Sequence, residues 1–283
     1  MRVLITGGAG RLGRALTQLV LQSGRQARVF DLPSCDFSGL EGAEVVAGDI
    51  ANAAAVDAAV EGTDLVVHPA AILPPLSERS SERTLAINVG GTERVVASAN
   101  RRGIPVVLAS SVAVYGRTAD KTPPVRTDWD CHPLDVYGES KLRAEEVVRG
   151  AGGAYTILRV SGIAVPAFLQ PPAVWPFAAE QRMEFVALAD VAAAFHACVE
   201  GLPAGNRTLH VSGGSTWRML GRQYVAELYR TMDIPLEEAR YLPAPGYFDW
   251  NDTGEANELL GYQETGFPAF LEQLKQAVEE ALA

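Results

Sequence analysis

A tyrosine and a lysine near the middle of the chain have the spacing that proton exchange with a hydroxyl group requires. Tyr137 and Lys141 begin the predicted helix Tyr137–Arg149, so their side chains share one face, roughly 6 Å apart. A phenol with a pKa near ~10 is a poor base at neutral pH, but a nearby ammonium and the positive end of a helix stabilise the phenolate. We therefore expect a lowered pKa at Tyr137 and proton transfer with a substrate hydroxyl. The alternative is a surface pair on an amphipathic helix.

Two serines, Ser110 and Ser111, directly follow the predicted strand Pro105–Ala109. Ligands of open α/β sheets bind at the carboxyl ends of the strands, so either hydroxyl could contact the same substrate oxygen as Tyr137. Serines at the end of a strand also cap local turns, which is the alternative for each of them. Their occurrence in a chain that also carries the Tyr137–Lys141 pair favours a catalytic role.

A glycine-rich turn opens the chain. The run Gly7–Gly13 carries glycines at positions 7, 10 and 13, directly after a predicted strand and before a predicted helix. Such glycines permit a tight turn and close backbone approach, so a pyrophosphate can bind the free N–H groups at the positive end of the helix. The turn therefore predicts a dinucleotide site, and an ordinary strand-to-helix turn is the alternative.

Asp31 ends the second predicted strand. A carboxylate at this place can accept hydrogen bonds from the hydroxyls of an adenosine ribose, and it would repel a 2′-phosphate. The sequence thus favours NAD over NADP. Arg25 and Arg28 are the residues that could reverse this preference, and a solvated carboxylate is the alternative for Asp31.

These residues must be positioned by an alternation of strands and helices. Strands are predicted at Val3–Thr6, Arg28–Phe30, Glu44–Ala47, Asp64–His68, Pro105–Ala109 and Thr156–Arg159. Helices are predicted between most of them, at Leu12–Gln22, Ala53–Glu61, Thr84–Arg101 and Tyr137–Arg149. Because the strands are apolar throughout, helices should cover both faces, which predicts an α/β fold with a doubly wound parallel (Rossmann) sheet.

The sequence changes character after about residue 160. Prolines crowd the following stretch together with Phe168, Trp175 and Phe177, which indicates irregular structure. Further elements are predicted at Asp190–Glu200, Thr208–Ser212, Arg218–Met232 and Pro268–Leu282. We expect residues 1–160 to form an NAD-binding domain. Residues 161–283 would form mainly a small C-terminal α/β substrate lobe, with elements at about 185–212 returning to the first domain.

The composition is that of a globular protein. The chain has 283 residues, 48% hydrophobic and 20% charged, and is long enough for two domains. A formal net charge of −10 argues against nucleic acid as a partner. The chain shows no leader-like start and no apolar run near the roughly 18 residues of a membrane span, so we expect a cytoplasmic protein without membrane contact. Its three cysteines lack CxxC spacing and are expected to be free thiols.

In combination, the motifs resemble those of the extended short-chain dehydrogenase/reductases, specifically the NAD-dependent epimerase/dehydratase family. The resemblance covers nearly the whole chain and is strongest over residues 1–160. Besides the glycine turn, Asp31 and the Tyr137–Lys141 segment, it is carried by Gly48-Asp49-Ile50, His68-Pro69-Ala70-Ala71, Asn88-Val89-Gly90-Gly91-Thr92 and Ser110–Gly116.

The resemblance implies a site residue by residue. Ser111, Tyr137 and Lys141 would be the catalytic residues, with Tyr137 and Lys141 also binding the cofactor, Lys141 through the nicotinamide ribose. Asp49 and Ile50 would hold the adenine. The full set of further NAD-binding residues would be Gly7, Gly10, Arg11, Leu12, Gly13, Asp31, Asp49, Ile50, Ala70, Ala71 and Asn88.

Several positions depart from the family's pattern. Val112 and Ala113 stand where sugar-nucleotide dehydratases carry an Asp-Glu pair, which argues against dehydration. Gly162 replaces the substrate-binding Asn of nucleotide-sugar epimerases, the segment before Phe185 is shorter than theirs, and Arg182 is one place off the usual arginine. These departures favour a smaller substrate, such as a sugar, a sugar acid or a small hydroxy or keto compound.

The sequence thus predicts an NAD-dependent oxidoreductase that transfers a hydride with the assistance of Tyr137, Lys141 and Ser111. One alternative is a redox-neutral sugar or nucleotide-sugar epimerase with tightly bound NAD. Another is a non-enzymatic dinucleotide-sensing protein, which typically lacks the tyrosine and lysine.

The remaining candidates are less specific. The four histidines lack metal-ligand spacing, so no metal site is predicted. The predicted helices Thr84–Arg101 and Tyr137–Arg149 pair subunits in relatives, which predicts a homodimer. Charged residues of the loop after the fourth strand either contact substrate or form a solvated surface, namely Glu78, Arg79 and Arg83. Aromatic residues either wall a pocket or pack the lobe, namely Trp175, Phe177, Tyr247, Phe248 and Trp250.

Overall fold

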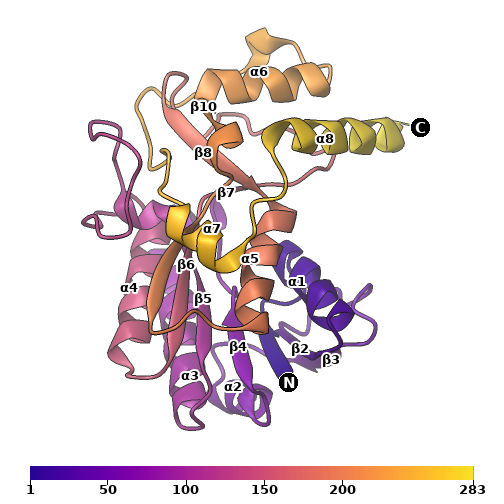
Figure 1. The fold of residues 1–283 in the computed structure, drawn as a ribbon, viewed down its shortest axis with the longest axis vertical. Helices are drawn as coiled ribbons and strands as arrows, with labels where there is room; N and C mark the ends of the chain where they lie inside the picture. Colours follow the sequence, from indigo (N-terminus) through magenta and orange to yellow (C-terminus); the bar gives the residue numbers. More distant parts are fainter. Residues whose placement is uncertain (283) are drawn as a thin grey trace.

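A computed structural model describes residues 1–282 of the protein (Figure 1). Within these residues, seven strands form the main sheet in the order β3-β2-β1-β4-β5-β6-β9. Their neighbours all pair in parallel, which confirms the predicted doubly wound sheet. The bounds, in sheet order, are Glu44–Ala47, Gln26–Asp31, Arg2–Thr6, Leu65–His68, Val106–Ser111, Tyr155–Val160 and Arg207–Val211.

Helices cover both faces of this sheet (Figure 1). On one face, α1 (Arg11–Gln22) packs beside α5 (Leu188–Glu200). The other face carries α2 (Ala53–Val60), α3 (Ser81–Asn100) and α4 (Val136–Gly150). Successive residues of a strand point to opposite faces, so a strand covered on both sides must be apolar throughout.

A smaller sheet, ordered β10-β8-β7, lies above the main one in Figure 1. Its strands are Arg218–Leu220, Arg182–Ala187 and Gly162–Ala164, and α6 (Gly221–Thr231) and α8 (Phe267–Leu282) accompany them. Aromatic side chains fill the core of this lobe, among them Trp175, Phe177, Phe185 and Phe248. Packing is therefore the role of Trp175 and Phe177.

Parts of the C-terminal half return to the main sheet. Strand β9 is its seventh strand, and α5 packs against α1. Helix α7 (Gly254–Leu260) and Tyr262 also join the main core, a return that the sequence analysis did not foresee. The Tyr262 hydroxyl accepts the N–H of Ser212 at 3.0 Å and donates to its carbonyl at 2.9 Å, so the segment is pinned to the end of β9.

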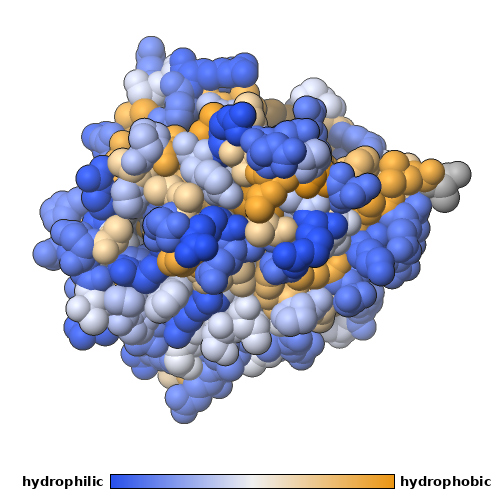
Figure 2. Space-filling view, turned by 90° about the horizontal axis from the view of Figure 1, so that it is seen from above, coloured by the Kyte–Doolittle hydropathy of each residue, from blue (hydrophilic) through white to orange (hydrophobic). Residues whose placement is uncertain are grey.

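The outer surface of the lobe is mainly hydrophilic. Figure 2 shows it from above, with apolar groups scattered between charged ones. Of the helices in residues 1–282, none has both the length and the apolar character that crossing a bilayer requires.

Candidate active site

A cleft of about 800 Å³ runs along the carboxyl ends of the main strands. It lies where the chain order reverses between β1 and β4, the place at which ligands bind in this fold. The structure brings nearly all of the predicted site residues together in its lining: Gly7, Gly10, Arg11, Leu12, Gly13, Asp31, Asp49, Ile50, Ala70, Ala71, Ser111, Tyr137 and Lys141.

The glycine turn packs too closely for other residues. Gly7 has a φ of +63°, and a Cβ on it would lie 2.8 Å from the Cα of Ala70. A Cβ on Gly13 would lie 2.4 Å from the Cα of Gly8. The glycines therefore allow the turn after β1, the segment after β4 and the start of α1 to pack closely together at the base of the cleft, where a ligand can approach the backbone.

The start of α1 is open to an anion. Helices α2, α3 and α4 begin at Asn52, Ser80 and Asp135, whose side chains accept first-turn N–H groups. Helix α1 begins at Gly10, which has no side chain to do this. Its first N–H groups and the positive end of its dipole therefore face the cleft, as a pyrophosphate site requires.

Asp31 lies at the end of β2 and is held against this turn. One carboxylate oxygen accepts the N–H of Ala9 at 3.0 Å, and the other accepts that of Leu32 at 2.8 Å. The two arginines that could have countered its charge have partners elsewhere. Arg28 pairs with Glu44 at 2.9 Å, and the Arg25 guanidinium bonds Glu200 at the end of α5. Neither arginine therefore pairs with Asp31, which lies at the end of β2 beside the glycine turn.

Arg14 supports this end of the cleft, although the sequence analysis missed it. Its guanidinium donates to the carbonyl of Ala9 at 2.8 Å and to those of Asp36 and Ser38. One side chain of α1 thus ties the glycine turn to the loop after β2, and these two segments flank Asp31. An arginine one turn into a helix carries no signal of such a role in a single sequence.

Tyr137 and Lys141 lie on the cleft-facing side of α4. The Lys141 Nζ donates to the carbonyl of Ala109 at 2.8 Å and lies 5.8 Å from the centre of the Tyr137 ring. Lys141 is buried, while Tyr137 is partly exposed to the cleft. The predicted juxtaposition of the two side chains is therefore present.

Burial governs the charge states of this pair. It raises the pKa of the Tyr137 phenol above the usual value, and hydrogen bonding to the Ser111 side chain opposes the rise in part. The expected lowering of this pKa is thus wrong for the protein alone, because desolvation outweighs stabilisation of the phenolate. Burial also lowers the pKa of Lys141 to about 8, although the negative charge of Glu145 opposes the fall.

The two serines at the end of β5 have different partners. Ser110 donates its hydroxyl to Glu145, behind the cleft. Ser111 accepts the N–H of Ala113 at 3.1 Å, and its side chain is hydrogen-bonded to that of Tyr137. Ser111 is therefore the serine that can donate to a substrate oxygen beside Tyr137.

A buried ion pair lies directly behind these residues. Glu145 of α4 accepts two hydrogen bonds from Arg159 of β6, at 2.9 and 2.7 Å, and both side chains are almost fully buried. Glu145 also accepts from Ser110 of β5 and, at 2.8 Å, from Arg149. The pair thus fixes α4 to the two strands whose ends form the site. Removing one partner of such a pair typically costs about 3–5 kcal/mol.

Asn88 lies behind the cleft. Asn88 is not among the residues that line the cleft in the described part of the chain. Its buried amide accepts the N–H of Ile72 at 2.7 Å and donates to the Ile72 carbonyl at 3.1 Å and to Ser140 at 2.9 Å. Asn88 therefore positions a lining residue and the first turns of α4, and its contact with the cofactor stays a prediction.

The loop after β4 also supports α4. Glu78 accepts the N–H groups of Val136 and Tyr137, both at 3.1 Å, so its carboxylate stabilises the positive end of that helix. Of the three charged residues predicted for this loop, Arg83 lies in the first turn of α3 and lines the cleft.

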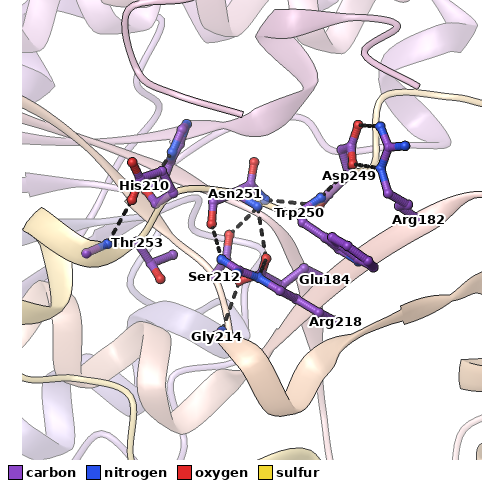
Figure 3. Close-up of polar contacts among 12 residues, drawn as sticks. Arg182, Glu184, His210, Ser212, Gly214, Arg218, Asp249, Trp250, Asn251 and Thr253 are labelled. Atoms are coloured by element: carbon purple, nitrogen blue, oxygen red, sulfur yellow. Dashed lines mark hydrogen bonds and ion pairs between the residues drawn. The ribbon is translucent and has the colours of Figure 1, made fainter. Parts of the chain in front are cut away.

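Two arginines at the lobe are neutralised by carboxylates (Figure 3). Arg182 donates to both oxygens of Asp249, at 2.6 and 2.9 Å. Arg218 donates to the fully buried Glu184 at 3.0 Å, and Glu184 also accepts the N–H of Asn251 at 2.9 Å. These contacts hold β8 and β10 to the C-terminal segment, so both guanidinium groups serve to stabilise the fold.

A profile of the NAD dependent epimerase/dehydratase family matches residues 3–169. The chain belongs to this family. It is therefore an enzyme, and its cofactor is NAD. The open start of α1 and the carboxylate of Asp31 fit the pyrophosphate and the adenosine ribose of this dinucleotide.

Curated relatives of this enzyme have different activities. A 3-beta-hydroxysteroid dehydrogenase of Mycolicibacterium neoaurum is 31% identical over 62% of this chain and 48% of its own length. A UDP-glucose 4-epimerase of Azospirillum brasilense is 31% identical over 56% of this chain and 47% of its own. In both cases the match spans about half of the relative.

Solved structures share the fold over the whole chain. The UDP-glucose 4-epimerase of Thermotoga maritima, with UDP-glucose, has a TM-score of 0.85 at 20% identity. The match covers 100% of this chain and 100% of that chain. A short-chain dehydrogenase/reductase superfamily protein of Agrobacterium tumefaciens, with bound NAD, has a TM-score of 0.83 at 23% identity over 100% of this chain and 98% of its own. At these identities the likeness establishes the fold.

Replacing Arg14 with alanine should weaken NAD binding. Loss of its three hydrogen bonds frees the loop after β2 and the glycine turn, so we expect the Kd of NAD to rise roughly 10-fold. Isothermal titration calorimetry measures this directly. Arg25→Ala is the matched control, since its guanidinium bonds Glu200 away from the cleft and its loss should leave the Kd unchanged. Equal affinities of Arg14→Ala and the wild type would contradict the assignment.

The lowered pKa of Lys141 predicts a pH-dependent stability. Folding shifts this pKa from 10.5 to about 8, so between these pH values the unfolded chain binds more protons than the folded one. The free energy of unfolding therefore increases as the pH rises. Between pH 8 and 10.5, the wild type should gain up to about 3 kcal/mol relative to Lys141→Met. Urea denaturation across this window measures the difference.

The exposed Lys275 of α8 supplies the control for this titration. Lys275→Met should keep a constant stability difference from the wild type over the same pH range. A constant difference for Lys141→Met as well would show that Lys141 keeps its ordinary pKa in the folded protein.

Proposed function

We propose that the protein is an NAD-dependent oxidoreductase that acts on a hydroxyl or carbonyl group of a sugar, a sugar acid or a small hydroxy or keto compound. The observation that carries the proposal is that Ser111, Tyr137 and Lys141 line the same cleft as the glycine turn and Asp31. Proton-exchanging groups thus lie in one cavity with the dinucleotide-binding elements.

Each catalytic side chain has a distinct task. In reduction, Tyr137 donates its proton to the carbonyl oxygen, while Ser111 donates a hydrogen bond to the same oxygen. In oxidation, the substrate hydroxyl proton passes to the Tyr137 phenolate, which the charged form of Lys141 stabilises. The bound dinucleotide would accept the hydride as NAD⁺ in oxidation and supply it as NADH in reduction. Lys141 would also hold the nicotinamide ribose.

A redox-neutral epimerase is the second candidate, because the family contains epimerases and one relative is a UDP-glucose 4-epimerase. Both reactions would use the same residues. An epimerase must, however, retain its oxidised intermediate while the hydride returns to the opposite face, and a nucleotide diphosphate provides such an anchor. Arg182 and Arg218 lie outside the cleft lining and pair with carboxylates, so neither supplies such an anchor, which supports the oxidoreductase.

Two further expectations stay predictions. One is a homodimer formed through α3 and α4, and the other is a cytoplasmic location.

Replacing Tyr137 with phenylalanine should remove most turnover. The substitution deletes the proton donor and acceptor but keeps the ring, so we expect kcat to fall by roughly 10²–10⁴-fold while the Kd of NAD stays nearly constant. NADH absorbance with a panel of sugars, sugar acids and small alcohols measures the rate. Tyr155→Phe, at the amino end of β6, is the matched control and should retain full activity. Retained turnover in Tyr137→Phe would refute the assigned role.

A further inference from the structure

The cleft extends beyond the catalytic residues into a region that we call the substrate chamber. Its residues come from the loop after β4, from α3, from the segment after β7 and from the C-terminal segment. None of these elements belongs to the glycine turn or to the adenosine end of the cleft within the described residues. The substrate chamber is lined by Leu73, Pro74, Arg83, Val165, Tyr247 and Phe248.

The substrate chamber is apolar. Tyr247 and Phe248 form one wall, with ring centres 4.6 Å apart. Among the described residues of the whole lining there is no asparagine, glutamine or glutamate, and the two aspartates, Asp31 and Asp49, lie at the adenosine end. A sugar presents several hydroxyls that need partners when they leave water, whereas an apolar body gains from contact with such walls. The lining therefore favours an apolar body over a polyhydroxylated one.

Arg83 supplies a positive charge at the edge of this chamber. It lies one turn before Ile87 on α3, and both side chains line the cleft. Its guanidinium is exposed, and within residues 1–282 no carboxylate lies within ion-pair distance of it. A planar guanidinium without a protein partner is well suited to bind a carboxylate through two hydrogen bonds.

Three further arginines, which lie outside the cleft lining, do not add to this charge. Arg159 is paired with Glu145, and the two arginines of the lobe are paired with Asp249 and Glu184. A diphosphate would therefore meet one unpaired cation in the chamber, which matches a single carboxylate better. The volume of the whole cleft, about 800 Å³, is within the roughly 300–1,000 Å³ typical of a site for one ligand. Because NAD would fill part of this volume, the space left for the substrate favours a small molecule.

Resting on the proposed oxidoreductase function, we propose that the substrate is a hydroxy or keto acid with an apolar body. Its carboxylate pairs with Arg83, and its body packs against Tyr247 and Phe248. In oxidation, the carbinol C–H bond breaks and its hydride passes to NAD⁺. The hydroxyl proton passes to Tyr137 and then to solvent, the C=O bond forms, and the products are the keto acid, NADH and one proton.

The test uses the secondary hydroxyoctanoates, with the hydroxyl on carbons 2 to 7, because they combine one carboxylate with an apolar chain. Their methyl esters, glucuronate and UDP-glucose are the comparison compounds. With the intact enzyme and NAD⁺, we expect at least one hydroxyoctanoate to form NADH with a kcat/KM at least 10-fold above those of its ester and of both sugar compounds.

Variants then test the pairing with Arg83. Arg83→Ala should raise the KM of the hydroxy acid at least 10-fold, leave the KM of the ester unchanged and leave the Kd of NAD unchanged. Arg83→Lys should restore part of the loss, since it keeps the charge without the planar fork. Arg79→Ala is the matched control, because Arg79 is an exposed arginine in the segment just before α3 and lies outside the described lining. Equal effects of Arg83→Ala on acid and ester would overturn the pairing.

The remaining outcomes separate this inference from the proposed function. A higher kcat/KM for glucuronate or UDP-glucose would overturn the apolar substrate class and leave the oxidoreductase intact. Calorimetry of the enzyme–NAD⁺ complex covers the case in which no NADH forms. If no hydroxyoctanoate binds, the substrate class is wrong. If one binds through Arg83 without NADH formation, the oxidoreductase function is wrong instead.

Discussion

The buried ion pair between Glu145 and Arg159 is the interaction on which the catalytic geometry depends. It joins α4 to β6, and the Ser110 hydroxyl adds β5 to the same carboxylate. Arg159 also donates to the hydroxyl of Tyr115, which bonds His210 of β9 at 2.7 Å. Two buried charges are tolerated because their hydrogen bonds are satisfied. The helix that carries Tyr137 therefore has a fixed position over the strand ends.

The same burial determines the chemistry of the catalytic pair. It keeps the proton on Tyr137 and brings the pKa of Lys141 to about 8. The free protein is thus prepared to donate a proton from Tyr137, whereas formation of the phenolate requires charged Lys141 and the positive charge that oxidised NAD brings. Coupling between cofactor binding and the ionisation of Tyr137 follows from this arrangement.

The sequence predicted the parts of the site that rest on local patterns. Glycines at fixed spacing, an i, i+4 tyrosine and lysine, and apolar strands each carry their signal within a few residues, and the structure places them in one cleft. Contacts between distant segments carry no such signal. Arg14 reaches the loop after β2, and Asn88 bonds Ile72 and Ser140 from behind the cleft. The pKa of Tyr137 also depends on burial, which follows from the tertiary packing.

The lobe contains the features that bear on the choice of substrate. Its arginines are committed to carboxylates that hold the fold together, and the wall of the cleft near it is aromatic. Neither of these two arginines therefore offers an anchoring charge to a nucleotide diphosphate. This arrangement favours net oxidation or reduction with exchange of the dinucleotide, as proposed above.

The dinucleotide content of the purified enzyme tests this distinction most directly. The protein is purified without added cofactor, dialysed and denatured, and the released NAD and NADH are measured per chain. An oxidoreductase that exchanges its cofactor should release far less than one dinucleotide per chain and should bind added NAD reversibly. Near-stoichiometric dinucleotide that survives dialysis would contradict this and indicate a redox-neutral epimerase.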